Sequence, residues 1–296
     1  NIFLQVIVIM IILNLQGGLG YQLFQISTAI SYAKHFNIEF KIKKHKNDIR
    51  TKQGYLRPTY WDSFFKELEP YLIETTNCSK RYNDPEFHFT PLPNLKEHLN
   101  DDFELNGLFQ SPIYFHKHIM EVDKILKIME KKKSIKNKHI DLYSSETISM
   151  HFRLGDFKHP DVKDNHPILK FSYYKNALKE IMKRTNKKDY LVIYFCEKED
   201  EKKVNDYVRY IRKDKQLKSL KFKRIDLELE DWEHMMLMSN CNHNIIANSA
   251  FSWWAAYLNS NKTKIITYPD VWFGGKLSHI KTDDLFPFNN WIKINN

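Results

Sequence analysis

The residues best suited to chemistry form three short groups, each placed where an apolar segment of the chain ends. One group lies at 151–156, where His151 and Arg153 alternate and Asp156 follows three residues after the arginine. Arginine presents a planar fork of donors that matches phosphate, and the carboxylate could hold the guanidinium in position. Polar side chains at the end of a buried strand are costly unless they find partners. The pattern favours an anion site, with a structural salt bridge as the alternative.

A second group is rich in glycine. The chain has 8 glycines in 296 residues, and Gly17, Gly18 and Gly20 lie close together. Glycine allows positive φ and close approach of the backbone to a ligand, and a following helix offers its first N–H groups to an anion. The spacing matches neither the dinucleotide fingerprint nor the P-loop. The group therefore indicates a ligand-contacting turn or simply a tight turn between strand and helix.

The third group, at 248–254, is expected to open another helix. Asn248 or Ser249 can cap that helix, and Ser249, Ser252 and the first-turn N–H groups would form a second anion site. We expect Trp253 and Trp254 to pack the helix against a sheet rather than to stack on a base.

Strands and helices must position these groups, and the hydrophobic pattern predicts an alternation of the two. The apolar run 7–15, the helical spacing of 22–36 and the run 38–42 predict a strand–helix–strand unit. A second alternation begins at 147 and implies a parallel sheet covered on both faces. The charged stretch 131–137 lacks an apolar stripe and is predicted to be a linker. The expected class is α/β, with two domains and a cleft between them.

Composition narrows the classes of function. There are 46 Lys+Arg against 36 Asp+Glu, a formal charge of +10, yet no nucleic-acid reading module is recognisable. The three cysteines are far apart, which argues against a disulfide framework. No apolar stretch reaches the roughly 20 residues that a membrane span needs. We therefore predict no nucleic-acid partner and a cytoplasmic location, with peripheral membrane contact left open.

Together the three groups resemble glycosyltransferase family 11, the α-1,2-fucosyltransferases that use GDP-fucose. Residues 17–22 are similar to the family's G-G-L-G-N-Q turn, and 151–156 to its H-x-R-R-G-D motif. The block 241–258 is very close to the family's C-x-H-x-I-I-A-N-S-[ST]-F-S-W-W. Shorter matches at 107–110 and 284–294 extend the resemblance over nearly the whole chain.

The resemblance implies a GT-B type fold of two Rossmann-like domains, here 1–140 and 141–296, with a last helix that packs back on the first. It also implies inverting transfer of fucose to a galactoside hydroxyl in α-1,2 linkage, without metal or cofactor. The C-terminal domain would hold the nucleotide sugar and the N-terminal domain the oligosaccharide acceptor. By analogy, Arg153 would stabilise the departing GDP and Asp156 would orient it.

The site residues that follow from the motifs fall into two sets. The catalytic set is His151, Arg153 and Asp156. The substrate-binding set is Gly17, Gly18, Gly20, Tyr21, Gln22, Asn248, Ser249, Phe251 and Ser252. Asp156, His151 and Glu197 are all candidates to accept the proton of the acceptor hydroxyl, and the sequence does not choose among them.

The chain departs from the family pattern at two positions. Tyr21 stands where the family has Asn, and Leu154 where it has a second Arg. Two alternatives therefore stay open beside the fucosyltransferase. One is an inactive or altered homologue that binds a glycan or nucleotide. The other is a transferase of the same fold that uses another nucleotide sugar.

Overall fold

The computed structural model describes residues 10–45, 48–50, 55–75, 78, 80–84, 87–94, 102–225, 228–286, 288 and 291–296. Contacts within the chain define an N-terminal unit, residues 1–128 with 280–285, and a C-terminal unit, residues 129–279 with 286–296. The division falls before the expected boundary at residue 140.

The N-terminal unit is built on a parallel sheet that has, among the described residues, five strands in the order β5-β2-β1-β7-β6. These strands are β1 Met10–Leu13, β2 Glu39–Lys43, β5 Leu72–Ile73, β6 Lys80–Asn83 and β7 Phe103–Asn106. The short strands β3 Ile49–Arg50 and β4 Leu56–Arg57 form an antiparallel pair. The helices are α1 Leu19–Phe36 and α2 Ile119–Leu126. The predicted strand–helix–strand opening is confirmed, although 7–9 of its first strand lie outside the described residues.

The C-terminal unit has a parallel sheet of six strands in its described part, in the order β10-β9-β8-β11-β12-β13. Taken along the chain this is the 3-2-1-4-5-6 order of a Rossmann fold. The strands are β8 Thr147–His151, β9 Leu191–Phe195, β10 Lys221–Arg224, β11 His243–Ile245, β12 Ile266–Pro269 and β13 Trp291–Ile294. Two parallel α/β units in one chain confirm the predicted α/β, GT-B type class.

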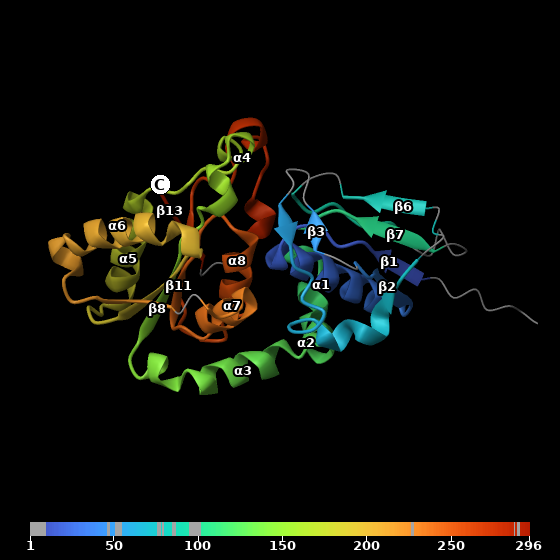
Figure 1. The fold of residues 1–296 in the computed structure, drawn as a ribbon, viewed down its shortest axis with the longest axis horizontal. Coiled ribbons are helices and arrows are strands. Elements are labelled where there is room, and N and C mark those ends of the chain that lie inside the picture. The colour runs from blue at the N-terminus through green and yellow to red at the C-terminus, as the bar shows by residue number, and fades with distance from the viewer. Residues whose placement is uncertain are drawn as a thin grey trace, which may run out of the picture. The chain divides into compact units, whose positions relative to one another are not determined.

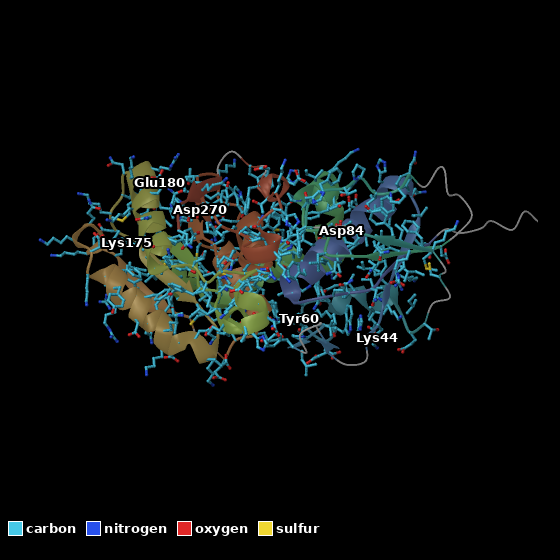
Figure 2. The ribbon with its side chains drawn as sticks, turned by 90° about the horizontal axis from the view of Figure 1, so that it is seen from above. Lys44, Tyr60, Asp84, Lys175, Glu180 and Asp270 are labelled. Atoms are coloured by element: carbon cyan, nitrogen blue, oxygen red, sulfur yellow. The ribbon has the colours of Figure 1, made fainter. Side chains whose placement is uncertain are left out.

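Helices cover both faces of this second sheet, as the apolar strands require. Its helices are α3 Ile128–Lys138, α4 Pro160–Lys163, α5 Phe171–Thr185, α6 Glu201–Arg212, α7 Asp231–Ser239 and α8 Ala250–Tyr257. Figure 1 shows α5 and α6 on one side of β8 and β11, and α7 and α8 on the other. The buried residues of α5, such as Leu178, join the core cluster beneath the strands, while Lys175 and Glu180 lie on its outer side (Figure 2).

Short 3₁₀ turns make many of the connections. They are η1 Lys66–Tyr71, η3 Pro112–Tyr114, η4 His116–His118, η5 Ile140–Tyr143, η6 Gly155–Lys158, η7 Lys198–Asp200, η8 Lys215–Leu217, η9 Gly275–Leu277 and η10 Asp283–Leu285. In the described parts of the chain, no helix has the length and apolar character needed to cross a bilayer.

The predicted linker at 131–137 is wrong, because these residues belong to helix α3. The buried stripe of this helix is Ile128, Lys132 and Ile135, so a lysine occupies its middle position and hides the apolar periodicity. The Lys132 ammonium donates to the carbonyl of Leu258 at 2.6 Å and to the Ser260 hydroxyl at 3.0 Å. Burial, together with nearby lysines, lowers the pKa of Lys132 to about 8.

In place of the expected last helix, the described residues Trp291–Ile294 form strand β13. This strand pairs with β12, with Trp291 opposite Ile266. A four-residue segment is too short for a helix with a buried face, whereas it suffices for an edge strand. Residues 280–285, rather than a terminal helix, belong to the N-terminal unit. Pro287, part of the matched tail motif, lies outside the described residues.

Candidate active site

Arg153 is fixed just beyond the carboxyl end of β8. Its guanidinium forms ion pairs with the carboxylates of Asp156 and Glu197, and it lies over the Phe157 ring at 4.9 Å. The predicted pair of Arg153 with Asp156 is therefore present. Glu197, which follows the neighbouring strand β9, supplies a second carboxylate. The Glu197 side chain is 45% exposed and that of Asp156 16% exposed, so Glu197 is the partner that water and ligands reach more easily.

Gly155 allows the two strand ends to come this close. It has a φ of +37°, and a Cβ at this position would lie 2.8 Å from the Arg153 Nη1 and would also clash with the Glu197 carboxylate. The Gly155 N–H donates to Asp200 at 2.7 Å, and Lys158 pairs with the same buried carboxylate at 2.6 Å. This bond raises the pKa of Lys158. Asp200 and Lys158 thus pin the loop that carries Arg153.

His151 is a candidate proton acceptor from the sequence, and its surroundings in the structure do not suit that role. It is buried, with its ring 5.4 Å from that of Phe251, and its Nδ1 has no hydrogen-bond partner in the described part of the chain. Burial, helped by the positive charge of Arg153 and by His234, lowers the pKa of His151 to about 3. The imidazole is neutral near pH 7, and a group with such a pKa is a poor proton acceptor there.

The order of the strands explains why the groups at 151–156 and 248–254 come together. Strand β8 lies between β9 and β11. The chain adds β9 and β10 on one side of β8, and then β11, β12 and β13 on the other side. Such a switch point is where open α/β sheets bind ligands, outside the carboxyl ends of the strands. Arg153 follows β8, and Ser249 follows β11 as the N-cap of α8. Ser249 makes no side-chain capping hydrogen bond, so the expected cap is not formed.

Asn248 and Ser252, both predicted to bind substrate, are buried and bonded within the fold. The Asn248 amide donates to the carbonyls of Pro167 and Trp272, at 2.9 and 3.3 Å. The Ser252 hydroxyl accepts the N–H of Ala247 at 3.2 Å. Their role in substrate binding stays a prediction, but these contacts show that they position the loops around the switch point. The Oδ1 of Asn248 is buried without a partner among the described residues.

The glycine turn lies in the N-terminal unit, at the carboxyl end of β1. Gly17 has a φ of +71°, and a Cβ here would lie 2.9 Å from the Tyr21 ring, which packs back over the turn. Gly18 is the N-cap of α1, and Gly20 lies in its first turn. Gln22 is fully buried, and its amide donates to the carbonyls of Gly17 at 3.0 Å and Pro58 at 2.7 Å. Gln22 therefore holds the turn in shape.

Sequence reasoning missed several contributors to these sites. Asp200 stands in an acidic run that reads as a solvated helix start, yet it is 1% exposed. Arg57, on the short strand β4, lies against Gly18, within 3.7 Å of where a Cβ would be. No local pattern signals either residue, because Asp200 lies in a 3₁₀ turn and Arg57 on a two-residue strand. The described residues contain no group of three His, Cys, Asp or Glu side chains arranged to hold a metal.

Residues 8–295 match the sequence model of one protein family, Glycosyl transferase family 11. This chain is a member of glycosyltransferase family 11. It is 24% identical to an alpha-1,2-colitosyltransferase of Escherichia coli over 96% of the chain and 98% of that protein. It is 28% identical to the O-antigen biosynthesis glycosyltransferase WbnK of Escherichia coli, over 69% of the chain and 64% of that protein. The family membership establishes the chain as a glycosyltransferase.

Solved structures resemble this family member more distantly. The ADP-heptose LPS heptosyltransferase II of E. coli is 11% identical, with a TM-score of 0.49 over 97% of this chain and 90% of its own. The fucosyltransferase NodZ from Bradyrhizobium is 12% identical, with a TM-score of 0.43 over 84% of this chain and 93% of its own. Likenesses of this extent carry no information about the sugar that is transferred.

Proposed function

We propose that this family 11 member transfers fucose from GDP-fucose to a hydroxyl of a galactoside, in α-1,2 linkage and with inversion. The observation that carries the proposal is Arg153, which is preorganised at the switch point of a Rossmann sheet by Asp156 and Glu197. A planar guanidinium at this place suits a diphosphate. The α8 N-terminus at Ser249 adds N–H groups that suit an anion.

In the proposed reaction the bond between the anomeric carbon and the diphosphate oxygen breaks, and its electron pair leaves with GDP. The acceptor hydroxyl oxygen attacks the anomeric carbon from the opposite face, which inverts its configuration. Negative charge grows on the departing diphosphate, and Arg153 stabilises it electrostatically. Because Arg153 already contacts two carboxylates, the diphosphate would replace Glu197, the more exposed of the two.

The acceptor hydroxyl must lose its proton in this reaction. His151 is a poor candidate, since its pKa is lowered to about 3 by burial and nearby positive charge. Asp156 would stay bound to Arg153 and hold it in place. Glu197, the more exposed of the two carboxylates at Arg153, is the remaining candidate.

One relative supports a second candidate for the sugar that is transferred. The E. coli protein that matches over 96% of this chain is named as a colitosyltransferase with the same α-1,2 linkage. Colitose is fucose without its 3-hydroxyl, so one pocket shape could accept either sugar, with the contacts to that hydroxyl deciding. Side-by-side rates with GDP-fucose and GDP-colitose on a panel of β-galactosides would decide the donor, with the linkage read by NMR.

The first test of the site is Arg153→Ala. We expect GDP release to fall by about 10²-fold or more, because a preorganised charge on the leaving group is lost. Arg209→Ala is the matched control, since Arg209 is an exposed arginine of α6 that pairs with Asp206 on its own helix. Equal rates for Arg153→Ala and the parent enzyme would refute the assigned role.

An inactive homologue is the other alternative, and Tyr21 motivates it. The Tyr21 ring covers Gly17 in the turn where the family has Asn. Calorimetry with GDP separates the two cases, because a dead homologue would bind GDP without turnover and would gain transfer activity on Tyr21→Asn. A cytoplasmic location and independence from metal and cofactor stay predictions.

A further inference from the structure

Three asparagines lie side by side at the carboxyl edge of the N-terminal sheet. In the parallel register Leu13 of β1 is opposite Leu105 of β7, and Leu105 is opposite Tyr82 of β6. The next residue after each of these three is an asparagine. Asn14, Asn106 and Asn83 therefore lie at the same level on three adjacent chain segments, with Asn106 paired directly with Asn83.

Hydrogen bonds join Gln16 to Asn106 and Asn106 to Asn83, and we call these three residues together with Asn14 the amide row. The Gln16 amide donates to the Asn106 Oδ1 at 2.6 Å, and the Asn106 amide donates to the Asn83 Oδ1 at 2.7 Å. The Gln25 side chain fixes the backbone of Gln16. It accepts the backbone N–H of Gln16 at 2.9 Å and donates to the backbone carbonyl of Gln16 at 2.8 Å. Gln16, Asn106 and Asn83 are thus held in one orientation before any ligand arrives.

Two independent features point to a ligand here. First, β1 lies between β2 and β7, so the switch point of this sheet falls between β1 and β7, where Gln16 and Asn106 lie. Second, the Oδ1 of Asn14 is buried and has no hydrogen-bond partner in the described residues. A buried carbonyl oxygen without a donor is costly, and a ligand hydroxyl could supply one.

The chemistry of the row suits a neutral ligand with several hydroxyl groups. Each side-chain amide offers both donors and an acceptor, and a sugar hydroxyl is likewise donor and acceptor at once. The nearest carboxylate along the chain is that of Asp84, which directly follows Asn83 (labelled in Figure 2). This carboxylate is bonded within the protein, because it accepts from the Phe109 N–H at 3.0 Å and from the Tyr114 hydroxyl at 3.2 Å. Asn83 is exposed and Gln16 and Asn106 are partly exposed, so the row is accessible.

We propose that the amide row binds the acceptor sugar and fixes which of its hydroxyls is presented for transfer. This inference rests on the proposed function, because the sugar that it names is the galactoside acceptor. The row directly precedes the glycine turn, since Gln16 is followed by Gly17. The acceptor is thus recognised by uncharged amides, whereas the donor is recognised by Arg153 and helix N–H groups.

The test uses the full chain with Asn83→Ala and Asn106→Asp, and Asn176→Ala as the matched control on the exposed side of α5. The acceptors are lactose, N-acetyllactosamine and Galβ1-3GalNAc. We expect each row variant to raise the acceptor KM about tenfold, the usual effect of losing one or two hydrogen bonds to a hydroxyl. GDP binding by calorimetry should stay unchanged, which also shows that the variants are folded. An acceptor KM within twofold of the parent value for both variants would overturn the proposal.

A second experiment tests the amide row even if the proposed transfer reaction does not occur. If the parent enzyme transfers neither fucose nor colitose, saturation-transfer NMR with the same three galactosides and GDP tests the row directly. Sugar signals with the parent and Asn176→Ala that are lost with Asn83→Ala would support the row as a sugar site. No signal with any of the three sugars, or signals that survive in Asn83→Ala, would overturn it.

Discussion

At the scale of single residues, Arg153 is the centre of the proposed donor site, and its two carboxylate partners differ in exposure. Asp156 lies three residues away on the same loop and is 16% exposed. Glu197 comes from a separate strand end and is 45% exposed. An incoming diphosphate competes with a carboxylate for the same guanidinium fork, so the exposed partner is the one to be displaced. Under the proposed mechanism, Glu197 would act in both nucleotide binding and catalysis.

Glu197→Gln separates these two roles. Removing the competing negative charge should tighten GDP binding by about threefold, since an exposed ion pair contributes only a fraction of a kcal/mol. The same change should lower kcat at least tenfold if Glu197 accepts the acceptor proton, because an amide cannot take it. Calorimetry and initial rates measure the two effects independently, with Glu199→Gln, an exposed neighbour, as control. An unchanged affinity for GDP would contradict the displacement of Glu197.

At the scale of elements, helix α3 shows how one residue can conceal a buried face. Ile128, Lys132 and Ile135 have helical spacing, but the lysine makes the segment read as polar. The ammonium is satisfied by the carbonyl of Leu258, the C-cap of α8, where a positive charge also meets the negative end of the helix. The same residue thus anchors α3 to α8, the helix that begins at the proposed donor site.

Lys132→Met tests this anchor. We expect it to lower the free energy of unfolding by about 1–3 kcal/mol, because the Leu258 carbonyl and the Ser260 hydroxyl lose their donor. Lys133→Met on the exposed side of the same helix should have little effect. Denaturant titration followed by tryptophan fluorescence measures both. Equal midpoints for the two variants would show that the buried ammonium contributes no stability.

At the scale of the whole molecule, buried neutral histidines make stability depend on pH. Burial lowers the pKa of His151 to about 3 and that of His243 to about 4. The His243 Nδ1 also accepts the N–H of Ile265 at 3.0 Å, which requires the unprotonated form. Unfolded histidine has a pKa of about 6.5. Below that value the unfolded chain binds protons that the folded chain does not, and stability is lost as pH falls.

We therefore expect the free energy of unfolding to fall between pH 6.5 and about 4, by up to about 1.4 kcal/mol per pH unit for each histidine. His243→Gln should make the decline shallower, whatever its effect at pH 7. Urea titrations at pH 7, 6 and 5 measure the slopes, with His279→Gln, outside the buried set, as the control. A slope that is the same in the parent and in His243→Gln would show that the folded chain binds a proton at His243 as readily as the unfolded chain does.

Much of the fold could be predicted because its determinants are local. Helices α5, α7 and α8 and strands β8, β9 and β12 follow from apolar residues at helical or continuous spacing. The edge strand β10 alternates charged residues with Phe222, and α3 has Lys132 in its stripe, so neither pattern shows which side is buried. The donor motif was predictable for the same reason, since Arg153 and Asp156 are only three residues apart.

By itself the sequence determined the family, the two α/β units and the residues of each motif, because these depend on neighbours along the chain. Only the tertiary structure decided which motif members face a site and which hold it together. Glu197 reaches Arg153 from 44 residues away. Asn106 bonds to Gln16 across 90 residues and to Asn83 across 23. The order of parallel strands sets such meetings, and it follows from the packing of the whole sheet rather than from any local pattern.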